Sequence, residues 1–335
     1  MYFISRNIEK MNVEEEKLFN CIRKKIPKNV SFTDEIADVL DISYDAAYRR
    51  VKGKTSLTLK ETLLLSKYFN LNLTDIFNDN EFDEERIIVE KTHPILSNNA
   101  LKVFFEKGTL EAQKVFSSKN GQIINCAKDY PFYHSDSGLL KSFRLYVFIN
   151  TLSKDPEEKK IPFSKFKPSA IILEKYEAFL NQYKKVSLIE VWNDSTIDNV
   201  LNQIQFFYEV GLTTKEETSL IAEGFKDSLR LIEEQSQNKK RQVNENSFQL
   251  FHNNIISLLN TVLMKSDAEK KVFVPYTNLT YFKVIDKNTT NQIEEYVKKQ
   301  IEFSNKLSGE ASFQRSKFFN AMNQKIDNKI LKLLL

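Results

Sequence analysis

Apolar and polar residues in the first part of the chain are spaced as in short amphipathic helices. In VEEEKLFNCIRKKI (13–26) the apolar residues recur every three or four positions, with acidic residues first and basic residues last, as the helix dipole favours. SFTDEIADVLDI (31–42) repeats this spacing, and Ser31 stands where it can cap a helix. The pattern predicts two short helices in these segments.

Three more helices are expected before the pattern changes. ISYDAAYRRVKGK (42–54) predicts a third helix that ends at Gly53, although its apolar residues are few. Thr58 and Glu61 have the spacing of a capping box, which would open a fourth helix, and NLNLTDIF (70–77) predicts a short fifth. We therefore expect a compact helical domain over residues 10–78.

The acidic, aperiodic segment NDNEFDEER (78–86) predicts a linker, which we place at residues 79–90. The remaining residues, 91–335, show helical patterns at about 137–152, 168–185, 194–210, 214–235, 245–264, 288–304 and 310–331. Asn120 and Gly121 between two β-leaning runs predict a hairpin, and alternation in KVFVPYTNLTYFKVID (271–286) predicts two more strands. The fold class expected is mainly α, with an α-rich second domain that contains a small antiparallel β-sheet.

Composition narrows the class of protein further. Among 335 residues, 41% are hydrophobic, so two folded domains are expected, and the formal net charge of +4 is only mildly basic. The first residues lack the apolar run of a secretory signal, and we find no stretch apolar enough to cross a membrane. The two cysteines lie far apart in sequence. We expect a soluble, cytoplasmic protein without membrane contact.

Candidate chemistry for an enzyme is missing from the sequence. The seven glycines form no nucleotide-binding loop motif, and the three histidines are isolated from one another and from the cysteines. We therefore expect no catalytic residue, no metal site and no cofactor. The aromatic loop KDYPFYH (128–134) is expected to pack against the predicted hairpin, with a pocket lining as the alternative, and Trp192 to lie in the core or an interface. The basic run 239–241 is expected to be solvated.

An aromatic stripe follows near the C-terminus, in SGEASFQRSKFFNAMNQKIDNKILKLLL (308–335). Phe313, Phe318, Phe319 and Met322 recur there at helical spacing. Such a stripe is expected to belong to the core, and a dimer interface is the alternative.

Several features of the first domain occur together in one order. EIADVLDIS (35–43) is followed by a basic helix, by Gly53 and by LTLKETLLLSKYFNLNLTDIF (57–77). This order resembles the XRE or Cro/repressor-like family of bacterial helix-turn-helix DNA-binding regulators, over roughly residues 13–77. The resemblance implies a five-helix, lambda-repressor-like domain. Asp41 occupies the turn position where the family usually has glycine, and aspartate tolerates the left-handed backbone required there.

The resemblance also implies roles for residues of a recognition helix at about 43–52, which would lie in the major groove. The residues facing base edges would be Ser43, Tyr44, Asp45, Tyr48 and Arg49. The residues holding phosphates would be Arg50, Lys52, Lys54 and Thr55. Arg50 occupies a position that is usually apolar in the family, so it could reach an acid instead of a phosphate, and Val51 could take over its burial.

Charge supports the same interpretation without the resemblance. Residues 46–60 hold five basic side chains and no acidic one, and a phosphate backbone attracts such a cluster. We expect a sequence-specific regulator that binds double-stranded DNA as a homodimer. The second domain is expected to mediate dimerisation and to sense an unidentified effector, if there is one. The alternative is a protein-interaction module, antitoxin-like or phage-type, with secondary DNA contact.

Overall fold

The structure is a computed structural model that describes residues 12–27, 29–71, 73–76, 87–152, 161–241, 243–277 and 279–335. The chain divides into two compact units, Met1–Ile87 and Ile88–Leu335. Most of the predicted linker, 79–86, and the edges of the predicted first domain, 10–11 and 77–78, lie outside the described residues. The end of the predicted linker belongs to the second unit, because Glu90 pairs with a strand there.

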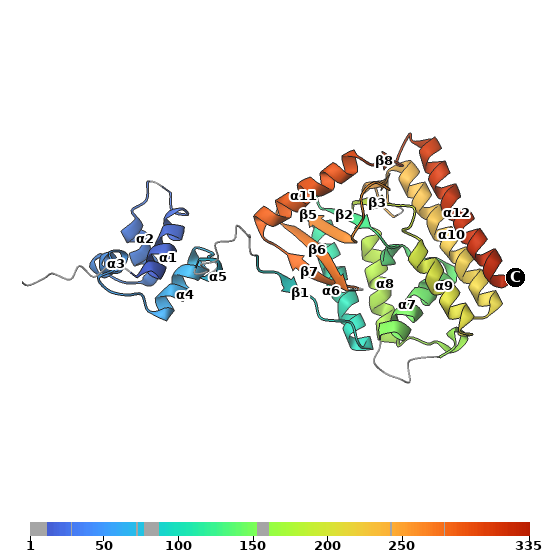
Figure 1. Ribbon diagram of the computed structural model, residues 1–335, viewed down its shortest axis with the longest axis horizontal. Helices are drawn as coiled ribbons and strands as arrows, with labels where there is room; N and C mark the ends of the chain where they lie inside the picture. Colours follow the sequence, from blue (N-terminus) through green and yellow to red (C-terminus); the bar gives the residue numbers. More distant parts are fainter. Residues whose placement is uncertain are drawn as a thin grey trace, which may run out of the picture. The chain divides into compact units, whose positions relative to one another are not determined.

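The first unit consists of short helices, coloured blue in Figure 1. They are α1 (Val13–Arg23), α2 (Phe32–Leu40), α3 (Tyr44–Val51), α4 (Leu59–Tyr68) and α5 (Leu73–Ile76). Their inward faces share one core, formed by Leu18, Phe19, Ile22, Ile36, Ala37, Leu40, Ala47, Val51, Leu65 and Phe69. The apolar periodicity of the sequence thus corresponds to buried residues on one face of α1, α2 and α3, whereas α4 itself buries only Leu65.

The second unit is built around a mixed sheet whose described strands follow the order β1-β7-β6-β5-β2-β3-β4-β8. Their bounds are β1 (Glu90–Lys91), β2 (Gln122–Ala127), β3 (Leu188–Trp192), β4 (Phe248–His252), β5 (Thr261–Lys265), β6 (Lys270–Thr277), β7 (Thr280–Val284) and β8 (Asn305–Lys306). The central strands β2, β3 and β4 are parallel, and the other neighbours are antiparallel. The small antiparallel sheet expected from the sequence is therefore wrong in size and in type.

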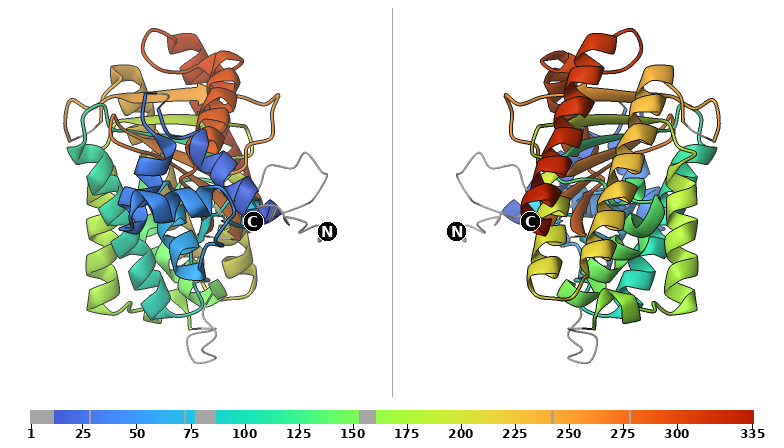
Figure 2. Two further views of the ribbon diagram at one scale, coloured as in Figure 1. Left: turned by 90° about the vertical axis from the view of Figure 1, so that its left-hand side faces the viewer. Right: turned by 90° about the vertical axis from the view of Figure 1, so that its right-hand side faces the viewer.

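Helices cover both faces of this sheet (Figure 1). They are α6 (Asn98–Ser117), α7 (Gly138–Leu152), α8 (Ala170–Tyr183), α9 (Asp198–Glu209), α10 (Lys215–Asn238), α11 (Lys287–Glu302) and α12 (Ser312–Leu334), with 3₁₀ turns η1 (Phe132–His134) and η3 (Phe163–Lys165). Helices α6 to α10 and α12 form the larger core with one face, and α11 closes the other. Figure 2 shows α10 and α12 side by side. No helix in the described part of the chain is long and apolar enough to cross a membrane.

Two local predictions for the second unit are wrong. No hairpin forms at Asn120 and Gly121, because the run before them belongs to α6 and the pair makes the turn into β2. The helix expected at 245–264 is replaced by β4 and β5. The run before Asn120 is the end of a 20-residue helix that packs against α8. The segment 245–264 becomes strands because β4 pairs with β3, and β5 pairs with β2 and β6.

The interior of the second unit contains a buried carboxylate. Glu190 on β3 is fully buried and accepts a hydrogen bond from the Tyr133 hydroxyl, and its Oε2 lies within hydrogen-bond distance of Nε2 of His134, at 2.8 Å. The aromatic loop 128–134 thus packs in the core, though not against a hairpin. Trp192 is also core.

The C-terminal aromatic stripe lies on α12. Phe318, Phe319 and Met322 are buried in the larger core, as expected from their spacing. Phe313, by contrast, is exposed.

Candidate nucleic-acid interface

A tight turn joins α2 to α3. Asp41 ends α2 with a left-handed backbone (φ 53°, ψ 50°), as expected for this position, and the Ile42 N–H donates to the Ala37 carbonyl at 3.1 Å. Ser43 then starts α3, because its Oγ accepts from the Ala46 N–H at 3.3 Å. Ala47, on the inner side of α3, is fully buried. The opposite side of α3 is therefore fixed toward solvent.

The exposed side of α3 carries the residues that the resemblance assigns to base contacts. Ser43, Tyr44, Asp45, Tyr48 and Arg49 are all exposed. The Tyr44 and Tyr48 side chains, one helical turn apart, are 50% and 40% exposed, and their rings stack with centroids 6.4 Å apart. Two exposed aromatic rings side by side form a small apolar surface that a binding partner can contact.

The segment after α3 returns toward the same side. Gly53 has a left-handed backbone (φ 68°), and the Lys54 N–H donates to the Arg49 carbonyl at 2.8 Å. The Nζ atoms of Lys52 and Lys54 lie 5.8 and 6.0 Å from the centre of the Tyr48 ring. Cations are attracted to aromatic faces at such distances, so both amines gather beside α3. Thr55, also exposed, follows directly.

We call the exposed residues Ser43, Tyr44, Asp45, Tyr48, Arg49, Lys52, Lys54 and Thr55 the basic face. Within the described residues, Arg49, Lys52 and Lys54 form no ion pair, and Asp45 is the single acid of the face. Asp45 lies in the first turn of α3, where the helix dipole favours a negative charge. The face thus carries three cationic side chains against one anionic side chain.

Arg50 differs from the phosphate contact expected for it. Its guanidinium contacts Oε1 of Glu61 on α4 through Nε at 2.9 Å and through Nη2 at 2.7 Å, and its Nη1 donates to the Ala46 carbonyl at 3.2 Å. The two side chains are only 17% and 13% exposed. Arg50 therefore joins α3 to α4 and is committed to an acid, the second of the two partners that the sequence left open. Val51 takes the buried position.

Glu61 makes this contact while it caps its own helix. Its Oε2 accepts from the Thr58 N–H at 2.8 Å, and its N–H donates to Oγ1 of Thr58 at 3.2 Å, which confirms the predicted capping box. Burial acts to raise the pKa of the Glu61 carboxyl, but the hydrogen bonds from Arg50 and Thr58 outweigh it and lower the pKa. The carboxylate stays ionised and holds Arg50 in place.

A further acid fixes the loop that precedes α4. Oε1 of Glu15 on α1 accepts from the Leu57 N–H at 2.8 Å. Sequence reasoning missed this contact, and nothing in the spacing of Glu15 indicates it. The second role of Glu61 was missed too, because the capping box already accounted for its position. Together these two carboxylates anchor both ends of the segment from α3 to α4.

Elsewhere in the described residues, no group of three or more histidine, cysteine, aspartate or glutamate side chains could hold a metal ion.

Comparisons of the chain with protein-family models, with curated proteins and with solved structures found no match.

Proposed function

We propose that the protein binds double-stranded DNA through the basic face and inserts α3 into the major groove. The observation that carries this proposal is the set of three cations, Arg49, Lys52 and Lys54, that have no carboxylate partner among the described residues. The neighbouring Arg50 is paired internally, so the unpaired cations of α3 and of the turn after it all lie on the exposed side of this helix. A row of phosphates is the partner that such a charge distribution attracts.

The side chains of the basic face suit different parts of DNA. Arg49 can give two hydrogen bonds to a guanine, a contact worth about 1–3 kcal/mol of discrimination. Tyr44 and Tyr48 can contact a thymine methyl or a phosphate, and Ser43 and Asp45 lie at the helix start, where base edges are nearest. Lys52, Lys54 and Thr55, directly after the last residue of α3, are assigned to phosphates.

The proposal includes two copies of the chain on one site. A single recognition helix reads only a few base pairs, too few to select one site among the many of a genome. Two copies would read half-sites about 34 Å apart, which is one turn of the double helix. We therefore propose a homodimeric, sequence-specific transcriptional regulator whose second unit provides dimerisation.

The salt dependence of binding tests the phosphate contacts. With a mixed-sequence duplex and the full chain, Lys54→Ala should reduce the slope of log affinity against log salt by about 0.9, since one phosphate contact is lost. Lys299→Ala is the matched control, because Lys299 is exposed on α11 in the second unit. Equal slopes for both variants and the wild type would contradict the assignment of Lys54.

One observation favours the alternative, a protein-interaction module. Leu59 and Leu63, one turn apart on α4, are 75% and 44% exposed, and exposed apolar side chains that lie together can mark a protein contact. DNA binding that is absent or insensitive to salt, together with a co-purifying protein that is lost in the Leu63→Ser variant, would support this function over DNA binding.

A further inference from the structure

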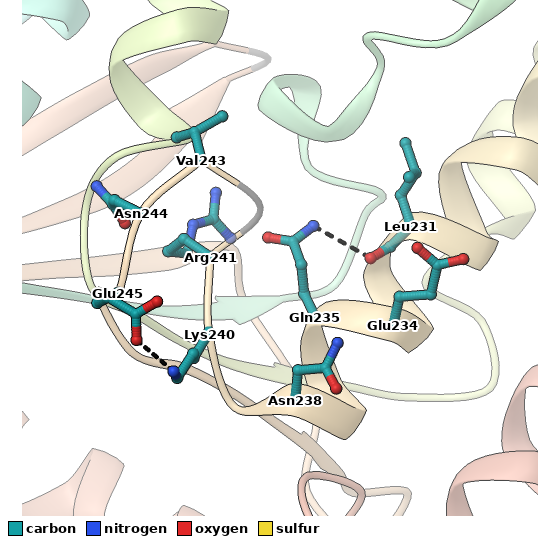
Figure 3. A pocket seen from close by; sticks show the side chains of 9 residues that line it. All are labelled: Leu231, Glu234, Gln235, Asn238, Lys240, Arg241, Val243, Asn244 and Glu245. Carbon is teal, nitrogen blue, oxygen red and sulfur yellow. Dashed lines mark hydrogen bonds and ion pairs between the residues drawn. The ribbon is translucent and has the colours of Figure 1, made fainter.

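A pocket of about 620 Å³ opens in the second unit, between the end of α10 and the segment that follows it (Figure 3). Its volume is within the range of small-molecule sites. Leu231, Glu234 and Gln235 line it from α10, and Arg241, Val243 and Asn244 line it from the following segment. The basic face is not part of this pocket, so the site is independent of the DNA proposal.

Arg241 is the unusual residue of this pocket. The sequence predicted a solvated side chain, but only 5% of Arg241 is exposed. Its Nε donates to the Lys184 carbonyl at 3.2 Å and its Nη2 to the Tyr183 carbonyl at 2.9 Å, and the guanidinium lies 5.3 Å from the centre of the Phe248 ring. These contacts fix the guanidinium in one orientation.

The remaining nitrogen of Arg241, Nη1, has no partner in the part of the chain that the structure describes. This atom is buried, and none of the described residues accepts a hydrogen bond from it. Arg241 forms no direct ion pair within the described residues. Burial lowers the pKa of its guanidinium, and attraction to the buried Glu190 carboxylate opposes this only in part. A buried donor without an acceptor is costly, and a fixed one is prepared to receive a ligand.

The facing wall of the pocket offers acceptors. Nε2 of Gln235 donates to the Leu231 carbonyl at 3.2 Å, which directs the amide oxygen of Gln235 across the pocket toward Arg241 (Figure 3). Glu234 lines the same wall. Lys240 is paired with Glu245, so neither of those charges competes for a ligand. The pocket thus presents one unsatisfied cationic donor opposite an amide oxygen.

We propose that this pocket binds a small molecule that carries a carboxylate with an N–H group a few bonds away, as in an N-acylated amino acid. The carboxylate accepts from Nη1 of Arg241, and the N–H donates to the amide oxygen of Gln235. Arg241 contributes the charge, and its contacts to Tyr183 and Lys184 hold it ready, so little ordering accompanies binding. Leu231 and Val243 supply the apolar walls.

Ligand-detected NMR on the full chain without DNA tests this proposal, with N-acetylglycine as the probe. We expect a dissociation constant on the order of 1 mM for so small a molecule, and no binding of glycinamide, which lacks the carboxylate. Gln235→Glu places a carboxylate opposite Arg241 and should weaken binding by about tenfold or more, since it occupies the guanidinium and repels the probe. Gln237→Glu is the matched control, because Gln237 is exposed on the same helix and does not line the pocket.

A second variant changes the shape of the pocket without changing its charge. Leu231→Trp fills space on the α10 wall and should also weaken the binding of N-acetylglycine, while thermal unfolding confirms that both variants are folded. Equal binding of N-acetylglycine and glycinamide would overturn the proposal. So would unchanged affinity in Gln235→Glu and Leu231→Trp, or no binding of N-acetylglycine to the wild type at ten times the expected constant.

Discussion

Replacement of Arg50 by alanine should destabilise the first unit, although Arg50 lies beside the basic face. The substitution removes two contacts to Oε1 of Glu61, at 2.9 and 2.7 Å, and one to the Ala46 carbonyl at 3.2 Å. Exposed ion pairs contribute about 0–1 kcal/mol, and breaking a buried one costs about 3–5 kcal/mol. With side chains 17% and 13% exposed, the Arg50–Glu61 pair lies between these cases, so we expect a loss of about 2 kcal/mol.

For a unit of this size, a loss of about 2 kcal/mol corresponds to a fall in Tm of about 10 °C. Scanning calorimetry of the full chain measures this change. The only tryptophan, Trp192, lies in the core of the second unit, so its fluorescence identifies the transition of that unit, which should not move. A double-mutant cycle with Glu61→Gln, which keeps an oxygen for the capping contact, should give a coupling energy of about 1–2 kcal/mol.

An unchanged Tm in Arg50→Ala, or a coupling energy near zero, would refute the structural role of Arg50. That side chain would then be free for a phosphate. DNA binding also distinguishes the two roles. If Arg50 is structural, the folded Arg50→Ala variant keeps the wild-type slope of log affinity against log salt, whereas loss of a phosphate contact would reduce this slope by about 0.9.

Three further predictions concern carboxylates. Because the fold lowers the pKa of Glu61, its carboxylate stabilises the first unit above the usual pKa of about 4.5, and this stabilisation is lost as the pH falls through the lowered pKa. The free energy of unfolding of the first unit should therefore depend less on pH in Glu61→Gln than in the wild type over this acid range. Burial acts to raise the pKa of Glu294, but hydrogen bonds from Lys270 and Lys265 lower it to about 2, so the second unit should lose stability as the pH falls from about 4.5 toward 2, and an unchanged acid profile in Glu294→Gln would contradict this. Glu190→Ala leaves the partners of a fully buried carboxylate unsatisfied and should cost about 3–5 kcal/mol in urea unfolding, whereas a loss below about 1 kcal/mol would be inconsistent with the buried contacts.

Local features of the first unit could be predicted from the sequence because neighbouring residues determine them. The left-handed Asp41, the Ser43 cap and the capping box of Thr58 and Glu61 each depend on a few consecutive residues, and each is confirmed. The exposed side of α3 followed from the scarcity of apolar residues in its sequence. The Arg50–Glu61 contact connects two helices, and no periodicity within one helix specifies such a pair.

The second unit was harder to predict because distant segments determine its sheet. Strands β3 and β4 pair in parallel with partners far away in sequence and are buried on both faces, so they lack the alternation that identifies a strand. The turn at Asn120 and Gly121 has the residues of a hairpin, but a helix precedes it. Arg241 belongs to a basic run that is typical of a solvated surface, and only the fold brings it against Phe248.

The most direct test of the central claim is selection of random double-stranded DNA by the full-length protein, followed by sequencing of the bound pool. The proposed function predicts an inverted repeat whose half-sites are about one helical turn apart, and a weaker preference at one base pair for the Arg49→Ala variant. A bound pool identical to the input at modest salt would contradict DNA recognition by the basic face.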